Sequence, residues 1–127
     1  MASVYRSMND DGEGHPLCGP SARMLGVRIR GDVAVSIDGV VSPGTGGMSV
    51  AVGSPRSLPR HRRPPEHGGI GEDPVWRIDV RDLPDTLIYR ADRERPDVHG
   101  FIEPREPVSL DDYQVALATS RTLWERI

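Results

Sequence analysis

The chain has 127 residues, of which 36% are hydrophobic, and a formal charge of −3, which fits one small domain with a single core. So mild a charge gives no general attraction to nucleic acid or membranes. All sixteen basic residues are arginines, which excludes lysine nucleophiles and Schiff bases, and the single cysteine, Cys18, excludes an intrachain disulfide and a cysteine-based zinc site.

The first 22 residues are polar and contain Gly and Pro without any hydrophobic periodicity. They are predicted to form a flexible leader before a single domain over residues 23–127. The leader has no basic start followed by an apolar stretch, so it is not expected to be a signal peptide. We expect cytoplasmic synthesis, and any delivery to a target cell would use a route that does not depend on an N-terminal signal. No association with membranes is expected, because no apolar run approaches the length of a membrane-spanning helix.

Alternating apolar and polar residues over 24–41 predict two strands joined at Gly31-Asp32. The segment "PGTGGMSV" over 43–50 then leads into a short strand over 48–52. Its glycines either reverse the chain or allow the backbone to approach a ligand closely. The segment is neither a P-loop nor a Rossmann fingerprint, because a strand follows the glycines where those motifs have a helix.

Residues 53–74 show no periodic pattern, which predicts a functional or mobile loop. The loop carries a basic cluster suited to phosphate binding, although it has no aromatic residues on which bases would stack. No metal site is expected, because His61, Glu66 and His67 do not have the spacing of a standard one. The cluster consists of Arg56, Arg60, His61, Arg62 and Arg63.

Three more strands are predicted over 75–80, 87–91 and 98–103, followed by a C-terminal helix. Ser109 is a suitable N-cap for that helix. Its inward face is predicted from spacings of three and four residues. The fold class is therefore α+β, with small, strongly twisted antiparallel sheets, long loops and a terminal helix. The inward face comprises Leu110, Tyr113, Leu117, Ser120, Trp124 and Ile127.

The order of these segments resembles a known family. A strand ending in Arg, then "DGVVSPGTGGMSV", a Trp-containing strand, "DLPDTLIY", "HGFIEP" and a final helix look like the small ADP-ribosyltransferase-like toxins that bacteria deliver through type VI secretion systems, and their actinobacterial relatives. In that family a P-x-T-G-G-x-S-V segment precedes an H-x-x-I-x-P strand. The resemblance covers residues 27 to 125 and is strongest at 44–50 and 99–104.

The resemblance implies a split sheet that holds NAD in a bent, extended shape between two small sheets. Arg30 would then grip the NAD phosphates or ribose, with Arg28 as the competing candidate. Ser49 would shape the nicotinamide-ribose pocket, and His99 would be the later polar residue facing the ribose or the acceptor. The backbone would approach the cofactor at Thr45, Gly46 and Gly47.

The chemistry implied is cleavage of the N-glycosidic bond of NAD, which passes through an oxocarbenium-like state that a nearby carboxylate stabilises. The chain has no Glu-x-Glu or Gln-x-Glu pair near its last strand. Glu103, in "IEPREP", is the candidate carboxylate by its position after the His strand. The implied partners are NAD, an unknown acceptor macromolecule and a cognate immunity protein.

Three functions are open at this point. The first is an ADP-ribosyltransferase-like toxin domain, with NAD glycohydrolysis as the variant in which water is the acceptor. The second is a non-catalytic relative of that fold, which binds a partner through its arginine-rich loop. The third is an RNA- or nucleotide-binding module that uses the loop over 56–63.

Overall fold

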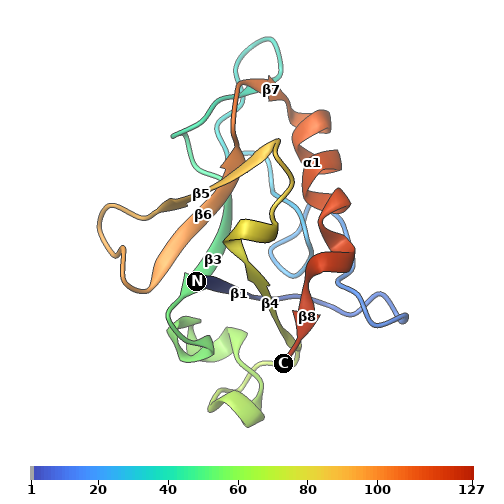
Figure 1. Ribbon diagram of the computed structural model, residues 1–127, viewed down its shortest axis with the longest axis vertical. Helices are drawn as coiled ribbons and strands as arrows, with labels where there is room; N and C mark the ends of the chain where they lie inside the picture. The colour runs from blue at the N-terminus through green and yellow to red at the C-terminus, as the bar shows by residue number, and fades with distance from the viewer. Residues whose placement is uncertain (1) are drawn as a thin grey trace.

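A computed structural model describes residues 2–127 and has one six-stranded, fully antiparallel sheet. Helix α1 (Leu110–Thr119) runs beside this sheet, and a separate two-stranded sheet lies near the start of the helix (Figure 1). The expected α+β class with a C-terminal helix is confirmed. The large sheet has the order β5 (Leu87–Ala91), β6 (His99–Pro104), β3 (Met48–Val52), β1 (Ser3–Ser7), β4 (Val75–Asp79) and β8 (Glu125–Arg126), and the small sheet pairs β2 (Val40–Val41) with β7 (Val108–Ser109).

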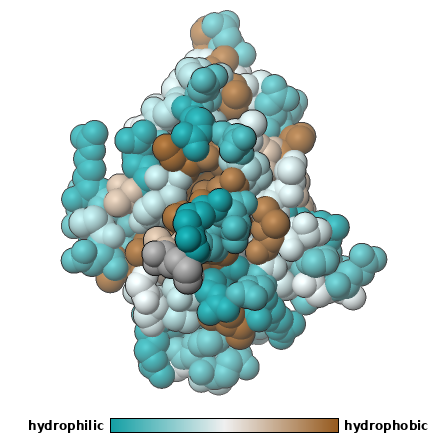
Figure 2. All heavy atoms as spheres, viewed as in Figure 1, coloured by the Kyte–Doolittle hydropathy of each residue, from teal (hydrophilic) through white to brown (hydrophobic). Residues whose placement is uncertain are grey.

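One face of the large sheet forms the core together with α1. Side chains alternate along each strand, and on this face they are almost fully buried against Tyr113 and Leu117 of the helix. The view in Figure 2 shows a mainly hydrophilic surface, with hydrophobic side chains in small separate groups. No helix among residues 2–127 is long and apolar enough to cross a bilayer. The buried sheet residues are Val4, Met48, Val50, Trp76, Ile78 and Ile102.

The expected flexible leader is wrong for residues 3–7, which form strand β1 in the interior of the sheet. This strand pairs with β3 on one side and with β4 on the other. Val4 is fully buried, and Arg6 is only 6% exposed on the same face. Because an arginine occupies an inward-facing position, the strand has no alternation that sequence reading would recognise. Met1, also assigned to the leader, lies outside the described residues.

The hairpin expected over 24–41 is also wrong, apart from the two residues of β2. Residues 28–33 form a tight turn, in which Asp32 N donates to Arg28 O over 3.0 Å and Arg30 has a φ of 67°. Before this turn, the backbone of Val27 hydrogen bonds to the Gln114 side chain through both its N–H and its carbonyl. A side chain of α1 therefore takes the place of a neighbouring strand.

The remaining predicted elements are confirmed with small changes at their ends. Strands β3 and β5 have their predicted bounds, and the hydroxyl of Ser109 accepts a hydrogen bond from Asp112 N at the start of α1. The helix is shorter than expected, because a 3-10 turn follows it and leads into β8. Trp124 is nevertheless buried, and its indole N–H donates to Ser120 Oγ over 3.1 Å.

The sheet divides into two halves near its centre. Strands β1 and β3 pair only at Val4↔Val52 and Tyr5↔Ala51. Beyond these pairs β1 continues along β4 as far as Ser7↔Val75, whereas β3 continues along β6. The β1–β4–β8 half and the β3–β6–β5 half therefore separate on one side of a short shared seam.

A tyrosine of the helix bridges β3 and β6 where their pairing ends. The buried hydroxyl of Tyr113 accepts from Met48 N over 3.1 Å and donates to Ile102 O. Gly47 precedes this point, and a Cβ there would lie 2.7 Å from Ile102 O and 3.1 Å from the tyrosine oxygen. The glycine thus allows the helix and two strands to meet closely.

We expect Tyr113→Phe to lower the free energy of unfolding by about 1–3 kcal/mol, because it leaves a buried N–H and a buried carbonyl without this partner. The measurement is urea denaturation followed by far-ultraviolet circular dichroism. Tyr89→Phe is the control, since the Tyr89 hydroxyl has no hydrogen bond within residues 2–127, and its effect should stay within about 0.5 kcal/mol. Equal losses for the two variants would contradict the bridging role.

Candidate functional site

A cleft of about 240 Å³ opens where β1 and β3 separate. Five parts of the chain surround it: the ends of these two strands, the irregular segment around Ala22, the turn over 28–32, the segment 57–62, and the β5–β6 connection with the start of β6. Its polar lining consists mainly of arginines, and its apolar lining of aliphatic side chains and prolines. The lining residues are Arg6, Ser7, Ala22, Arg28, Asp32, Ser49, Val50, Ala51, Ser57, Leu58, Pro59, Arg62, Arg95, Val98 and His99.

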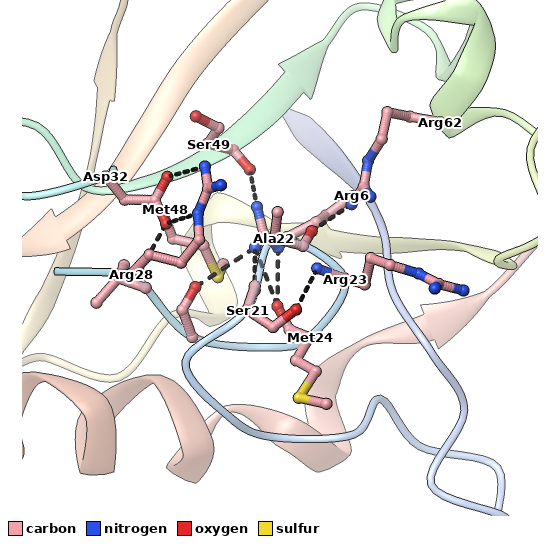
Figure 3. Close-up of polar contacts among 12 residues, drawn as sticks. Arg6, Ser21, Ala22, Arg23, Met24, Arg28, Asp32, Met48, Ser49 and Arg62 are labelled. Carbon is pink, nitrogen blue, oxygen red and sulfur yellow. Dashed lines mark hydrogen bonds and ion pairs between the residues drawn. The ribbon is translucent and has the colours of Figure 1, made fainter. Parts of the chain in front are cut away.

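Arg6 forms the floor of this cleft and connects three parts of the chain (Figure 3). Its Nη1 donates to Ser49 O over 2.8 Å, across the gap between β1 and β3. Its Nε and Nη2 both donate to Met24 O, over 3.2 and 3.0 Å. Longer bonds from Nη2 reach Ser21 O and Gly26 O. The buried guanidinium therefore fixes the irregular segment 21–26 against the sheet.

No carboxylate within residues 2–127 forms an ion pair with Arg6, because its hydrogen bonds go to backbone carbonyls. Burial lowers the pKa of Arg6 to about 10, with a further contribution from the neighbouring Arg62. The residue remains cationic at neutral pH, since this pKa is still well above 7. Its positive charge is thus held at the cleft without a carboxylate in direct contact, and Asp32 is the nearby carboxylate that attracts it.

Arg62 reaches the cleft from the segment that was expected to be a functional or mobile loop. Residues 55–67 fold into three short 3-10 helices, and Arg62 Nη2 donates to Ser7 O over 2.9 Å and to Ala22 O (Figure 3). Desolvation lowers the pKa of this guanidinium also. Arg63 turns back to His67 O over 2.9 Å. Two arginines of the basic cluster are therefore used within the fold, which leaves a smaller free basic patch than the sequence indicated.

The other two arginines of the cleft differ in their partners. Arg28 forms an ion pair with Asp32 at 3.1 Å, and Asp32 is the only carboxylate among the residues that line the cleft. Arg95 is exposed in the β5–β6 connection, and its guanidinium has no hydrogen bond or ion pair within residues 2–127. Four arginines therefore surround the cleft with one carboxylate, which is an arrangement suited to an anion.

His99 lies at the rim of the cleft and is held on two sides. Its Nδ1 is 2.7 Å from Asp92 Oδ2, and the edge of the ring meets Phe101 with ring centres 4.9 Å apart. The pKa of Asp92 is lowered by the backbone N–H of Glu94 and then by His99, so this carboxylate stays ionised. The histidine thus has a fixed anionic partner on one ring nitrogen.

The cleft brings together four of the residues that the sequence singled out, namely Arg28, Ser49, His99 and, from the basic cluster, Arg62. Arg30 and Thr45 lie instead in a separate hollow on the outer side of the 28–33 turn.

The remaining glycine and carboxylate candidates also lie outside the cleft. Gly46 has a φ of 108°, and a Cβ there would be 2.5 Å from Asp32 O. Both Gly46 and Gly47 are therefore required by internal packing. Glu103 is fully buried, with Arg90 Nε at 2.5 Å and Gly44 N at 3.0 Å. Its carboxylate secures the glycine segment to β6 and does not line the cleft.

Sequence reasoning missed Arg6, Asp32, Asp92 and Arg95. The local signal for Arg6 was "SVYRS", in which Val4 and Arg6 share one strand face, but its polar residues were read as part of a leader. Asp92 had no sequence signal that separated it from the other charged residues of its segment, because only the hairpin register brings it to His99. Within residues 2–127 there is no group of three or more His, Cys, Asp or Glu that would hold a metal.

No model of a known protein family matches this chain, and no curated protein matches it significantly. Arguments about function therefore rest on the geometry of the cleft and on the resemblance noted from the sequence.

Replacing Arg6 by Met should lower the free energy of unfolding by about 2–4 kcal/mol, because several backbone carbonyls lose a charged donor. Arg95→Met changes an exposed arginine of the same cleft and should stay within about 0.5 kcal/mol. Urea denaturation of both variants measures the difference. If Arg6→Met unfolds at the same urea concentration as the unsubstituted protein, Arg6 does not hold segment 21–26 in place.

Proposed function

We propose that the chain is an ADP-ribosyltransferase-like domain that binds NAD in the cleft between β1 and β3 and transfers ADP-ribose from it to an acceptor. The observation that supports this most strongly is the gathering of four arginines with one carboxylate around a cleft that also contains Ser49 and His99. The family resemblance had marked these last two residues from sequence order alone.

The arginines have different numbers of N–H groups free for the NAD pyrophosphate. Each guanidinium has five N–H donors. Arg6 uses most of its donors on carbonyls, whereas Nε and Nη1 of Arg62 and the whole guanidinium of Arg95 have no partner within residues 2–127. We therefore assign the grip on phosphate to Arg62 and Arg95, and the shaping of the cleft to Arg6.

The size and lining of the cleft favour partial enclosure of the dinucleotide. A volume of about 240 Å³ is below the roughly 300–1,000 Å³ typical of small-molecule sites. One half of NAD would thus lie inside and the other across the open mouth. Val50, Leu58, Pro59 and Val98 supply the apolar walls for a flat ring. Such enclosure would hold the nicotinamide ribose, which is the main requirement for cleaving its glycosidic bond.

Besides the arginines, Ser7 contributes a hydroxyl group to the lining of the cleft. It is 1% exposed, and its hydroxyl is buried without a hydrogen-bond partner within residues 2–127. Buried hydroxyls are normally hydrogen bonded. Ser7 lines the cleft together with Arg6 and Arg62, so a ligand oxygen bound there would have a donor available beside the two guanidinium groups.

Isothermal titration calorimetry with NAD tests the proposal. We expect binding by the unsubstituted protein, and a loss of affinity of about tenfold, or roughly 1.4 kcal/mol, in Arg95→Gln. Arg93→Gln is the matched control, because Arg93 is exposed in the same connection but lines a different hollow. Ser49→Ala should weaken the binding of NAD without unfolding the protein. When the unsubstituted protein is incubated with NAD, free nicotinamide should appear in the solution.

The absence of heat at millimolar NAD would overturn the proposal. Equal effects of the substitutions at Arg93 and Arg95 would show instead that the protein attracts NAD through its general charge and not through the cleft.

A further inference from the structure

The connection between β5 and β6 contains a histidine–carboxylate pair whose geometry is specific. The two residues close the hairpin, because Asp92 N donates to His99 O over 3.1 Å and His99 N donates to Arg95 O over 3.0 Å. Their side chains then meet at 2.7 Å through Nδ1 and Oδ2. The second carboxylate oxygen accepts from Glu94 N over 2.9 Å. A backbone N–H thus holds the Asp92 carboxylate in place, and the carboxylate in turn orients the imidazole ring of His99.

This arrangement determines which ring nitrogen is basic. An ionised carboxylate only accepts hydrogen bonds, so Nδ1 must carry the proton that it donates to Asp92. In the neutral ring Nε2 is then an acceptor with a free lone pair. Nε2 has no partner within residues 2–127, and the side chain is 22% exposed beside the cleft that His99 lines. The Phe101 edge limits rotation of the ring.

We propose that His99 is the general base of the reaction and that Asp92 is its positioning residue, so that the acceptor of ADP-ribose is a protic oxygen, either water or a hydroxyl group. This inference rests on the proposed function, because it assigns the proton transfer within that same reaction. A carboxylate acceptor would need no base at pH 7, whereas a hydroxyl or water does.

The acceptor O–H gives its proton to Nε2 of His99 while its oxygen forms a bond to C1′ of the nicotinamide ribose. The bond from C1′ to the pyridinium nitrogen breaks, and its electron pair stays on that nitrogen, so that neutral nicotinamide leaves. Asp92 stabilises the imidazolium that forms, which then releases its proton to solvent. No oxidant or reductant is required.

Kinetics of nicotinamide release test the base. We expect His99→Gln to lower kcat by at least about 100-fold, with KM changed less than about threefold. Asp92→Asn should lower kcat at least about tenfold, because the amide no longer fixes the tautomer. Asp97→Asn is the matched control, since it removes the same charge from an exposed position in the same connection, and it should match the unsubstituted protein.

Nitrogen-15 NMR of the imidazole tests the positioning without NAD. The unsubstituted protein should show the proton on Nδ1, and Asp92→Asn should show a mixture of tautomers. A proton found on Nε2 of the unsubstituted protein would overturn the inference.

Calorimetry separates this inference from the proposed function. If NAD does not bind, both are overturned. If NAD binds but the unsubstituted protein releases no nicotinamide, the proposed transfer of ADP-ribose and the inference about His99 are both overturned. If nicotinamide is released but His99→Gln releases it at the same rate, only the inference about His99 is overturned.

Discussion

A cationic side chain buried among backbone carbonyls is the interaction on which the rest of this fold depends. Arg6 bridges the separation of β1 and β3 by donating to Ser49 O, and it holds segment 21–26 through Met24 O and its neighbours. An aliphatic residue would fill the position without satisfying these carbonyls. The arginine therefore makes the separation of the two sheet halves stable and at the same time defines the floor of the cleft.

The same arginine links stability with ligand binding. A buried charge without a carboxylate partner costs free energy of desolvation, which here is offset by hydrogen bonds to carbonyl dipoles. Arg62 adds a second partly desolvated cation close by. An anion in the cleft would interact favourably with both, and binding to the folded state alone raises stability. The buried charges that cost free energy of desolvation are thus the same charges that favour an anionic ligand.

The sequence predicted the elements whose signals are local. Strand β3 and the Ser109 cap follow from alternation and from a serine before acidic residues, and both are observed. Strand β1 was missed because Arg6 occupies a core position, so that its inward face does not read as apolar. Apolar and polar residues alternate over segment 24–41, but within it the backbone of Val27 hydrogen bonds to the side chain of Gln114. No local sequence pattern specifies this contact.

For the site, the order of motifs indicated Ser49 and His99, and the structure places both at one cleft. It also indicated Arg30, whose place at the cleft is taken by Arg28, two residues earlier on the same turn. The groups around the cleft that sequence reasoning overlooked come from β1, from the turn over 28–33 and from the connection between β5 and β6. These groups lie close together because of the strand register and the length of each connection. The spacing of residues along the sequence does not determine either of these.

The central position of β1 also has a consequence for how the chain folds. This strand is synthesised before the other strands of its sheet. Both of its neighbours, β3 and β4, come much later in the sequence, and β8 completes the sheet. Pairings between such distant segments require closure of long loops, which makes folding slow relative to helical proteins of this size. During synthesis the last of the carbonyls that accept from Arg6, Ser49 O, becomes available only when β3 has emerged. The cleft is therefore complete only after His99 has been synthesised, and shorter chains lack part of its lining.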